Sequence, residues 1–156
     1  MFGCRYKKYP LEFRGDPING IQYFLTIYSG GKALRMLIDS GACISLIGNI
    51  HLKGCSYTNI PHKQTLLGVS GEMQAKNILF DFDLEKPCGS NTPKYNQLFA
   101  IAFKKDNLMF NSDDEDGCAG VLGSTFLQFC DINLREGYIK VYNNAGYVTK
   151  SLRQQE

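Results

Sequence analysis

The amino-acid sequence predicts an all-β fold with one short helix. Stretches rich in aromatic and β-branched residues, such as residues 21–28, recur along the chain, and these residue types favour strands. Glycine-containing turns such as Ser29-Gly30-Gly31-Lys32 separate these stretches. Only residues 125–130 have the pattern of a helix, with Ser124 in position to cap the first turn.

The first strands are expected to form two hairpins. Residues 21–28 and 33–38 form the first hairpin, and residues 44–50 follow as a further strand. The second hairpin lies within residues 62–80, with one arm on each side of Gly68-Val69-Ser70-Gly71. Later strands are expected at residues 98–103, 121–123, 131–134 and 138–142, and exposed loops at residues 87–97 and 104–117.

Length and composition indicate a single globular domain. A chain of 156 residues is too short for two lobes that each bury a sizeable core. The formal net charge is only +2, and Lys and Arg are scattered among Asp and Glu, so we expect neither a nucleic-acid partner nor a membrane partner. The expected organisation is an N-terminal arm at residues 1–20, one folded domain at residues 21–145 and a C-terminal tail at residues 146–156.

The cysteines and the N-terminus bear on the cellular compartment. No apolar run approaches the roughly 20 residues that cross a bilayer, and the basic N-terminus is not followed by an apolar signal core. The cysteines form no CxxC pair, so we expect free thiols in a reducing compartment and a cytoplasmic location. They are Cys4, Cys43, Cys55, Cys88, Cys118 and Cys130.

An acidic residue follows directly on an apolar strand at Leu37-Ile38-Asp39. A charge at the end of a buried strand is costly unless pairing or function accounts for it. The next residues, Ser40 and Gly41, suit a tight turn, since a short hydroxyl can bond to the backbone and glycine accepts sharp conformations. The tripeptide taken alone therefore fits both an ordinary turn and a functional carboxylate.

Three motifs occur in order along the chain. The first is Leu37-Ile38-Asp39-Ser40-Gly41-Ala42, the second is the glycine-bearing hairpin tip at residues 67–71, and the third is Val121-Leu122-Gly123 before the short helix. In this order the chain resembles the retropepsin family of aspartic proteases, with the resemblance extending over residues 21–142. The resemblance implies a small closed β-barrel-like acid-protease fold and an aspartic-type endopeptidase that acts on extended peptides.

The same resemblance implies a homodimer. In aspartic proteases two carboxylates share a proton. One acts as base on a water molecule and the other polarises the scissile carbonyl, and no metal or organic cofactor takes part. The chain contains a single Asp-Ser-Gly, so the second carboxylate must be Asp39 of another copy. The implied site consists of Asp39 as the catalytic residue, Ser40 and Gly41 as supports of the catalytic loop, and Ala42, Leu67, Gly68, Val69, Ser70, Gly71, Val121 and Leu122 in the cleft and the flap.

Alternative interpretations stay open for several of these features. Cys43 stands where many relatives carry a polar or acidic residue, and residues 85–118 form a longer segment than in compact viral enzymes. Gly68 and Gly71 also fit an ordinary hairpin turn, and Val121-Leu122 also fits plain core. A catalytically inactive module that kept the fold for dimerisation or peptide binding is the main rival function.

Metal binding is not expected. His51, Cys55 and His62 lack the paired spacing of zinc ligands. The acidic run at residues 113–116 lacks the alternating ligand pattern of calcium loops, so it is interpreted as a solvated loop.

Overall fold

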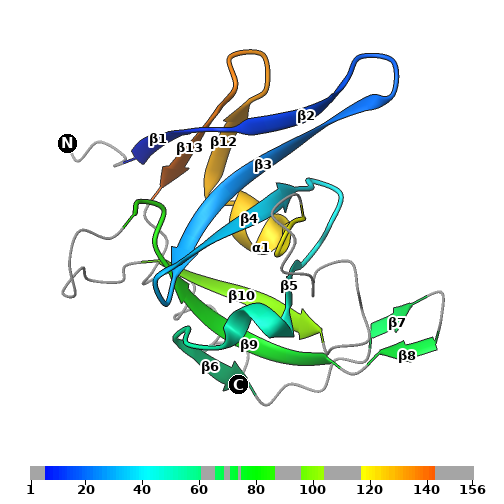
Figure 1. Ribbon diagram of the computed structural model, residues 1–156, viewed down its shortest axis with the longest axis vertical. Helices are drawn as coiled ribbons and strands as arrows, with labels where there is room; N and C mark the ends of the chain where they lie inside the picture. Colours follow the sequence, from blue (N-terminus) through cyan, green and yellow to red (C-terminus); the bar gives the residue numbers. More distant parts are fainter. Residues whose placement is uncertain are drawn as a thin grey trace.

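The computed structural model describes residues 6–60, 66–68, 71–73, 75–86, 96–103 and 117–142. In this part of the chain the secondary structure is mostly strand with one short α-helix, which confirms the predicted class (Figure 1). The elements are β1 (Tyr6–Pro10), β2 (Glu12–Asp16), β3 (Gly20–Ser29), β4 (Lys32–Ile38), β5 (Ser45–Gly48), the 3-10 helix η1 (Asn49–Leu52), β6 (Tyr57–Ile60), β7 (Leu66–Gly68), β8 (Gly71–Met73), β9 (Ala75–Phe82), β10 (Asn96–Phe103), β11 (Gly120–Leu122), α1 (Ser124–Leu127), β12 (Cys130–Asn133) and β13 (Tyr138–Tyr142).

The described strands form three sheets. The main sheet has eight strands in the order β2-β3-β4-β11-β5-β10-β9-β6, a second sheet has the order β1-β13-β12, and β7 pairs with β8 alone. In Figure 1 the β2–β3 hairpin and the three-stranded sheet lie at the upper end of the molecule, and β6, β9 and β10 lie at the lower end. The strand β11 therefore lies near the middle of the main sheet, although it comes late in the sequence.

The main sheet does not close into a barrel, so this part of the prediction is wrong for the described residues. Its edge strands, β2 and β6, each pair with one neighbour only. A single bridge brings Tyr28 of β3 against Asp83, with backbone hydrogen bonds of 2.7 and 2.8 Å. Barrel closure needs a continuous ladder with a fixed stagger between strands, and one bridge bends the sheet without providing that ladder.

Two strands occur where the sequence predicted only a polar arm. β1 pairs with β13, and β2 pairs with β3, so residues 6–16 are part of two sheets. The local sequence Tyr6-Lys-Lys-Tyr-Pro10 has a weak strand pattern, and pairing with distant strands decides its conformation. The division into arm, domain and tail stays a prediction.

The remaining elements follow the sequence closely. The first hairpin, the strand at β10 and the final hairpin are confirmed within two residues of their predicted bounds. The helix runs from Ser124 to Leu127, so it begins one residue earlier and ends three residues earlier than predicted, and Gly123 is its N-cap instead of Ser124. The strand expected at residues 44–50 ends at Gly48 and continues as η1, and β6 was not predicted.

The main hydrophobic core joins the two larger sheets and the helix. Ile27, Met36 and Phe80 of the main sheet, Phe126 of α1 and Ile139 of β13 are all fully buried in it. The Phe126 ring packs edge-on against the ring of Phe82 at a centroid distance of 5.8 Å. This contact fixes the helix against the sheet.

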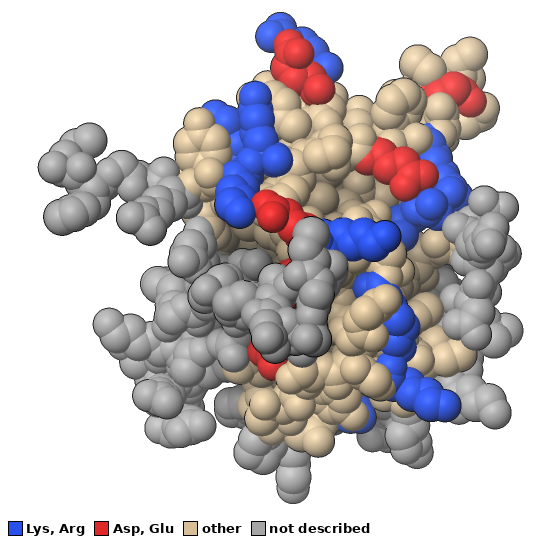
Figure 2. Space-filling view, turned by 60° about the vertical axis from the view of Figure 1, so that its left-hand side comes forward, with Lys and Arg blue, Asp and Glu red and all other residues tan. Residues whose placement is uncertain are grey.

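Charges are mixed on the surface. On the face that Figure 2 shows, described Lys and Arg side chains lie beside Asp and Glu side chains over the upper half. Exposed ion pairs such as Lys7 with Glu85, at 2.9 Å, contribute little to stability. In the described ranges, no helix is long and apolar enough to cross a membrane.

The described cysteines are free thiols, as predicted for these positions. They are Cys43, Cys55, Cys118 and Cys130. Burial, and then the charge of Asp131, raises the pKa of the Cys130 thiol to about 12. Cys43, by contrast, is exposed.

Replacing Phe126 with alanine should lower the free energy of unfolding by about 3–5 kcal/mol, because the mutation leaves a cavity where helix and sheet meet. Phe13→Ala is the matched control, since the Phe13 side chain is 65% exposed, and should change stability by less than about 1 kcal/mol. Denaturant unfolding measures both. Equal losses in the two variants would contradict the position of Phe126 in the core.

Candidate active site

Asp39 begins the loop that leaves β4. Its backbone N–H donates to the carbonyl oxygen of Leu122 at 3.1 Å. Leu122 belongs to β11, which runs parallel to β4 with Leu122 opposite Ile38. The start of the loop is therefore held by a strand from a distant part of the sequence.

The loop closes on its own carboxylate. The Gly41 N–H donates to Asp39 Oδ1 at 2.9 Å, and the Ala42 N–H donates to the Asp39 carbonyl oxygen at 3.1 Å. This is an Asx turn, in which a short acidic side chain bonds to the backbone two residues on. A Cβ atom at Gly41 would lie 3.3 Å from Asp39 Oδ1, so glycine leaves room for the carboxylate.

The Asp39 side chain is exposed, which differs from the sequence expectation of a charge made costly by burial. Leu37 and Ile38 are half-buried, and the chain emerges from the sheet after them. Among the described residues, only Gly41 donates a hydrogen bond to the carboxylate. Within the described part of the chain, Oδ2 accepts no hydrogen bond.

The end of the loop packs tightly against the junction of β11 and α1. The Ser124 N–H donates to the Ala42 carbonyl oxygen at 2.8 Å. A Cβ atom at Gly123 would lie 2.5 Å from that same oxygen and 2.8 Å from the carbonyl oxygen of Ile44. Only glycine allows this approach, so Gly123 belongs to the site although the sequence analysis gave it no role of its own.

A pair of hydroxyls lies behind the loop. Ser45 of β5 is fully buried, and its Oγ accepts hydrogen bonds from the Gly123 N–H at 3.0 Å and from Thr125 Oγ1 at 2.7 Å. The Ser45 N–H donates to Thr125 Oγ1 at 3.0 Å. This pair is not evident from the sequence, where the only signal is a serine inside an apolar strand.

An apolar cluster borders the loop. Val121 and Ile101 are buried at its centre, and half-buried Leu37, Ala42, Ile44, Leu46, Ala75 and Cys118 surround them. Leu122 lies in the main core instead and is fully buried. Of the predicted pair, only Val121 therefore lies on the side of the sheet shared with Ala42, while Leu122 contributes its carbonyl oxygen to the loop.

The predicted flap lies partly outside the described residues. β7 and β8 pair with Leu67 opposite Glu72 and Gly68 opposite Gly71, as expected for the arms of a hairpin. Val69 and Ser70 are outside the described residues. The role of this hairpin as a flap stays a prediction.

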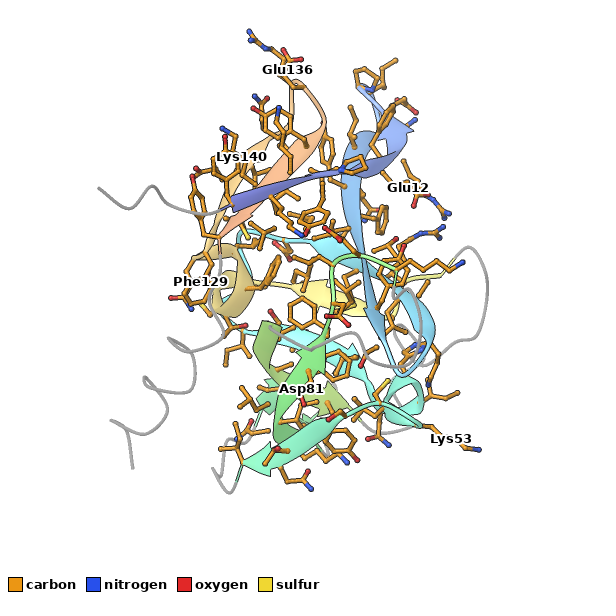
Figure 3. All side chains as sticks on the ribbon, turned by 90° about the vertical axis from the view of Figure 1, so that its left-hand side faces the viewer. Glu12, Lys53, Asp81, Phe129, Glu136 and Lys140 are labelled. Carbon is orange, nitrogen blue, oxygen red and sulfur yellow. The ribbon has the colours of Figure 1, made fainter. Side chains whose placement is uncertain are left out.

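Two other aspartates accept hydrogen bonds from side chains outside the Asp39 loop. The Asp81 carboxylate accepts a hydrogen bond from Ser56 Oγ at 2.8 Å, and the Asp131 carboxylate accepts one from the Tyr142 hydroxyl at 2.9 Å. Figure 3 shows Asp81 on β9 in the lower half of the molecule, far from Lys140, which pairs opposite Asp131 in the upper sheet. These aspartates therefore do not meet in one site.

Asp16 has a structural role in the β2–β3 turn. Its carboxylate accepts hydrogen bonds from the side chain and backbone of Asn19 and from the backbone of Ile18. These bonds hold the pKa of the Asp16 carboxyl below its ordinary value. The Asp16 carboxylate therefore stabilises the β2–β3 turn.

The residues considered for metal binding do not form a cluster in the described part of the chain. Cys55 Sγ donates to the backbone carbonyl oxygen of His51 in η1 at 3.1 Å, which is a local structural contact. His62 and residues 113–116 lie outside the described residues.

Comparison with known proteins gives structural neighbours only. No protein-family model matches the chain, and no curated protein matches it in sequence. A retropepsin-like aspartic protease from Rickettsia conorii is similar at a TM-score of 0.48, with 12% identity over 91% of this chain and 96% of that one. The EIAV protease complexed with the inhibitor HBY-793 is similar at a TM-score of 0.41, with 14% identity over 69% of this chain and 86% of that one. Both neighbours are distant, so the roles of residues in this chain are inferred from its own geometry.

Replacing Gly123 with alanine should push the Asp39 loop away from β11 and lower the free energy of unfolding by about 1–3 kcal/mol, because the new methyl group meets two carbonyl oxygens. Ser124→Ala is the control, since that side chain is exposed and next in sequence. Thermal unfolding and amide hydrogen exchange at Asp39 measure the effect. Wild-type exchange at Asp39 in Gly123→Ala would contradict the close packing.

Proposed function

We propose that the chain is a retropepsin-type aspartic endopeptidase whose catalytic dyad is formed by Asp39 of two identical copies. The observation that carries this proposal is the fixed, exposed carboxylate of Asp39. Its loop is bonded to β11 at its start and to the β11–α1 junction at its end, and Oδ1 is oriented by Gly41. A carboxylate held in one orientation and open to solvent suits general acid–base chemistry on a bound water.

We propose that the second carboxylate comes from another chain, because the sequence contains a single Asp-Ser-Gly. Asp16, Asp81 and Asp131 are engaged elsewhere in the described structure. An exposed Asp39 can approach its own copy across a twofold axis, which a buried one could not. We propose that the exposed Ser40 bonds to the loop of the partner at that axis.

In such a dyad, two carboxylates a few ångströms apart share one proton. The ionised carboxylate takes a proton from a water molecule, which attacks the scissile carbonyl carbon. The protonated carboxyl donates a hydrogen bond to the carbonyl oxygen. The tetrahedral intermediate then breaks its C–N bond, and the proton taken from water passes from the carboxyl to the leaving amine nitrogen. These steps use only the carboxylates and water, so the proposed reaction requires no organic cofactor.

The apolar cluster beside the loop supports a preference for apolar substrate side chains. Val121, Leu37 and Leu46 lie side by side across three neighbouring strands and meet Ala42 at the loop. We propose that an extended peptide lies along this surface, that Gly41 orients its backbone, and that the hairpin at residues 67–71 closes over it. Free thiols such as the exposed Cys43 suit a cytoplasmic location.

A non-catalytic module is the alternative, because an Asx turn also stabilises ordinary loops. Such a module would bind a peptide, or a second copy of the chain, without cleaving anything. The fold alone does not distinguish the two functions.

Asp39→Asn should reduce cleavage of a peptide library by at least about 100-fold, because the amide can neither accept the proton of water nor share one. Asp81→Asn is the matched control and should retain cleavage, since Asp81 lies on β9 and bonds to Ser56. Cys43→Ser should also retain it, because the thiol is not the nucleophile. Mass spectrometry of the cleaved peptides gives both the rate and the side-chain preference.

These measurements distinguish the aspartic endopeptidase from the non-catalytic module. Cleavage that persists in Asp39→Asn, or that is lost in folded Cys43→Ser, contradicts the aspartic mechanism. A folded wild-type chain that binds peptides of the library but cleaves none supports the non-catalytic module.

A further inference from the structure

We propose that the buried hydroxyls of Ser45 and Thr125 are positioning groups that set the location of the Asp39 carboxylate; this inference rests on the proposed function. Neither side chain contacts the carboxylate in the described structure. Both act through the backbone of the loop and of the β11–α1 junction.

The hydroxyl pair is joined at two points. Thr125 Oγ1 donates to Ser45 Oγ at 2.7 Å and accepts from the Ser45 N–H at 3.0 Å. Ser45 Oγ also accepts from the Gly123 N–H at 3.0 Å. Three hydrogen bonds therefore connect Ser45 of β5, which is fully buried, to Gly123 and to Thr125 of α1.

The position of Gly123 carries this connection to the loop. The residue before it, Leu122, accepts the hydrogen bond from the Asp39 N–H at 3.1 Å. The residue after it, Ser124, donates to the Ala42 carbonyl oxygen at 2.8 Å. The Ser45 hydroxyl thus holds the middle of a three-residue segment whose two outer residues bond to the two ends of the Asp39 loop.

Because Ser45 is buried, its hydrogen bonds favour one geometry of the β11–α1 junction. A buried hydroxyl is costly unless it is hydrogen-bonded, so an apolar residue would serve packing better at Ser45. Once formed in a site of low dielectric, such a network has one favoured geometry. A small shift of Gly123 would move both ends of the loop together, because both of its neighbours bond to the loop.

Thr125 offers the cleaner test, because it is half-buried and two substitutions separate shape from hydrogen bonding. Thr125→Val keeps the shape and removes the hydroxyl. Thr125→Ser keeps the hydroxyl and removes a methyl group. Ser45→Ala removes the other member of the pair.

In the full-length protein, Thr125→Val and Ser45→Ala should each lower kcat by about 10- to 100-fold with little change in KM, because misplacement of a reacting group by about 1 Å costs rates of that order. Thr125→Ser should stay within about threefold of wild type, and the double variant should lose little more than either single variant, because the hydroxyls act as a unit. A Thr125→Val enzyme with wild-type kcat, or a Thr125→Ser enzyme as impaired as Thr125→Val, overturns the proposal. So does a loss that appears only in KM.

Amide hydrogen exchange gives a readout that does not depend on cleavage. Thr125→Val should speed exchange at the amides of Asp39 and Gly41 and leave Ile139 of the core unchanged, whereas Thr125→Ser should leave all three unchanged. If the wild-type chain cleaves no peptide, the proposed function is wrong and the exchange data alone decide the positioning role. Unchanged exchange at Asp39 and Gly41 in Thr125→Val overturns that role.

Discussion

The insertion of β11 between β4 and β5 is the constraint on which the rest of the site depends. β11 runs parallel to β4 and antiparallel to β5, so a strand from late in the sequence separates two strands that follow each other in the chain. The backbones of β11 and β5 lie so close together that a Cβ atom at Gly120 would overlap the carbonyl oxygen of Leu46. Because the pairing ends beside Asp39, the loop at the end of β4 acquires partners that its own sequence could not supply.

The same insertion gives the main sheet two different faces. Side chains alternate along a strand, so Val121 faces the apolar cluster beside the loop and Leu122 faces the main core. The core side is completed by Phe126, which follows β11 in the short helix. The core and the candidate site thus share the segment formed by β11, Gly123 and α1, and a change at Gly123 acts on both.

The sequence predicted best those elements that are formed by residues close together in the chain. The hairpin of β3 and β4 and the Asp39-Ser40-Gly41 turn are each encoded by neighbouring residues, and their positions followed from the sequence. The short helix was also predicted, but it ends three residues earlier than its local pattern indicated. β1 was missed because its pairing with β13 is decided by residues at the other end of the chain. The hydroxyl pair was missed for the same reason, since Ser45 and Thr125 are 80 residues apart and meet only in the folded chain. The exposure of Asp39 was also not predictable, because an apolar strand gives no sign of where it leaves the sheet.

The shared dyad is tested most directly by mixing wild-type chain with Asp39→Asn chain in equal amounts and allowing the subunits to exchange. Random pairing leaves about one quarter of the dimers with two aspartates, so activity per wild-type chain should fall to roughly half. The measurement is the rate of peptide cleavage at concentrations above the dimer dissociation constant, with exchange verified by mass spectrometry of differently labelled chains. Undiminished activity per wild-type chain despite exchange, or full activity from a strictly monomeric chain, would contradict a site built from two copies of Asp39.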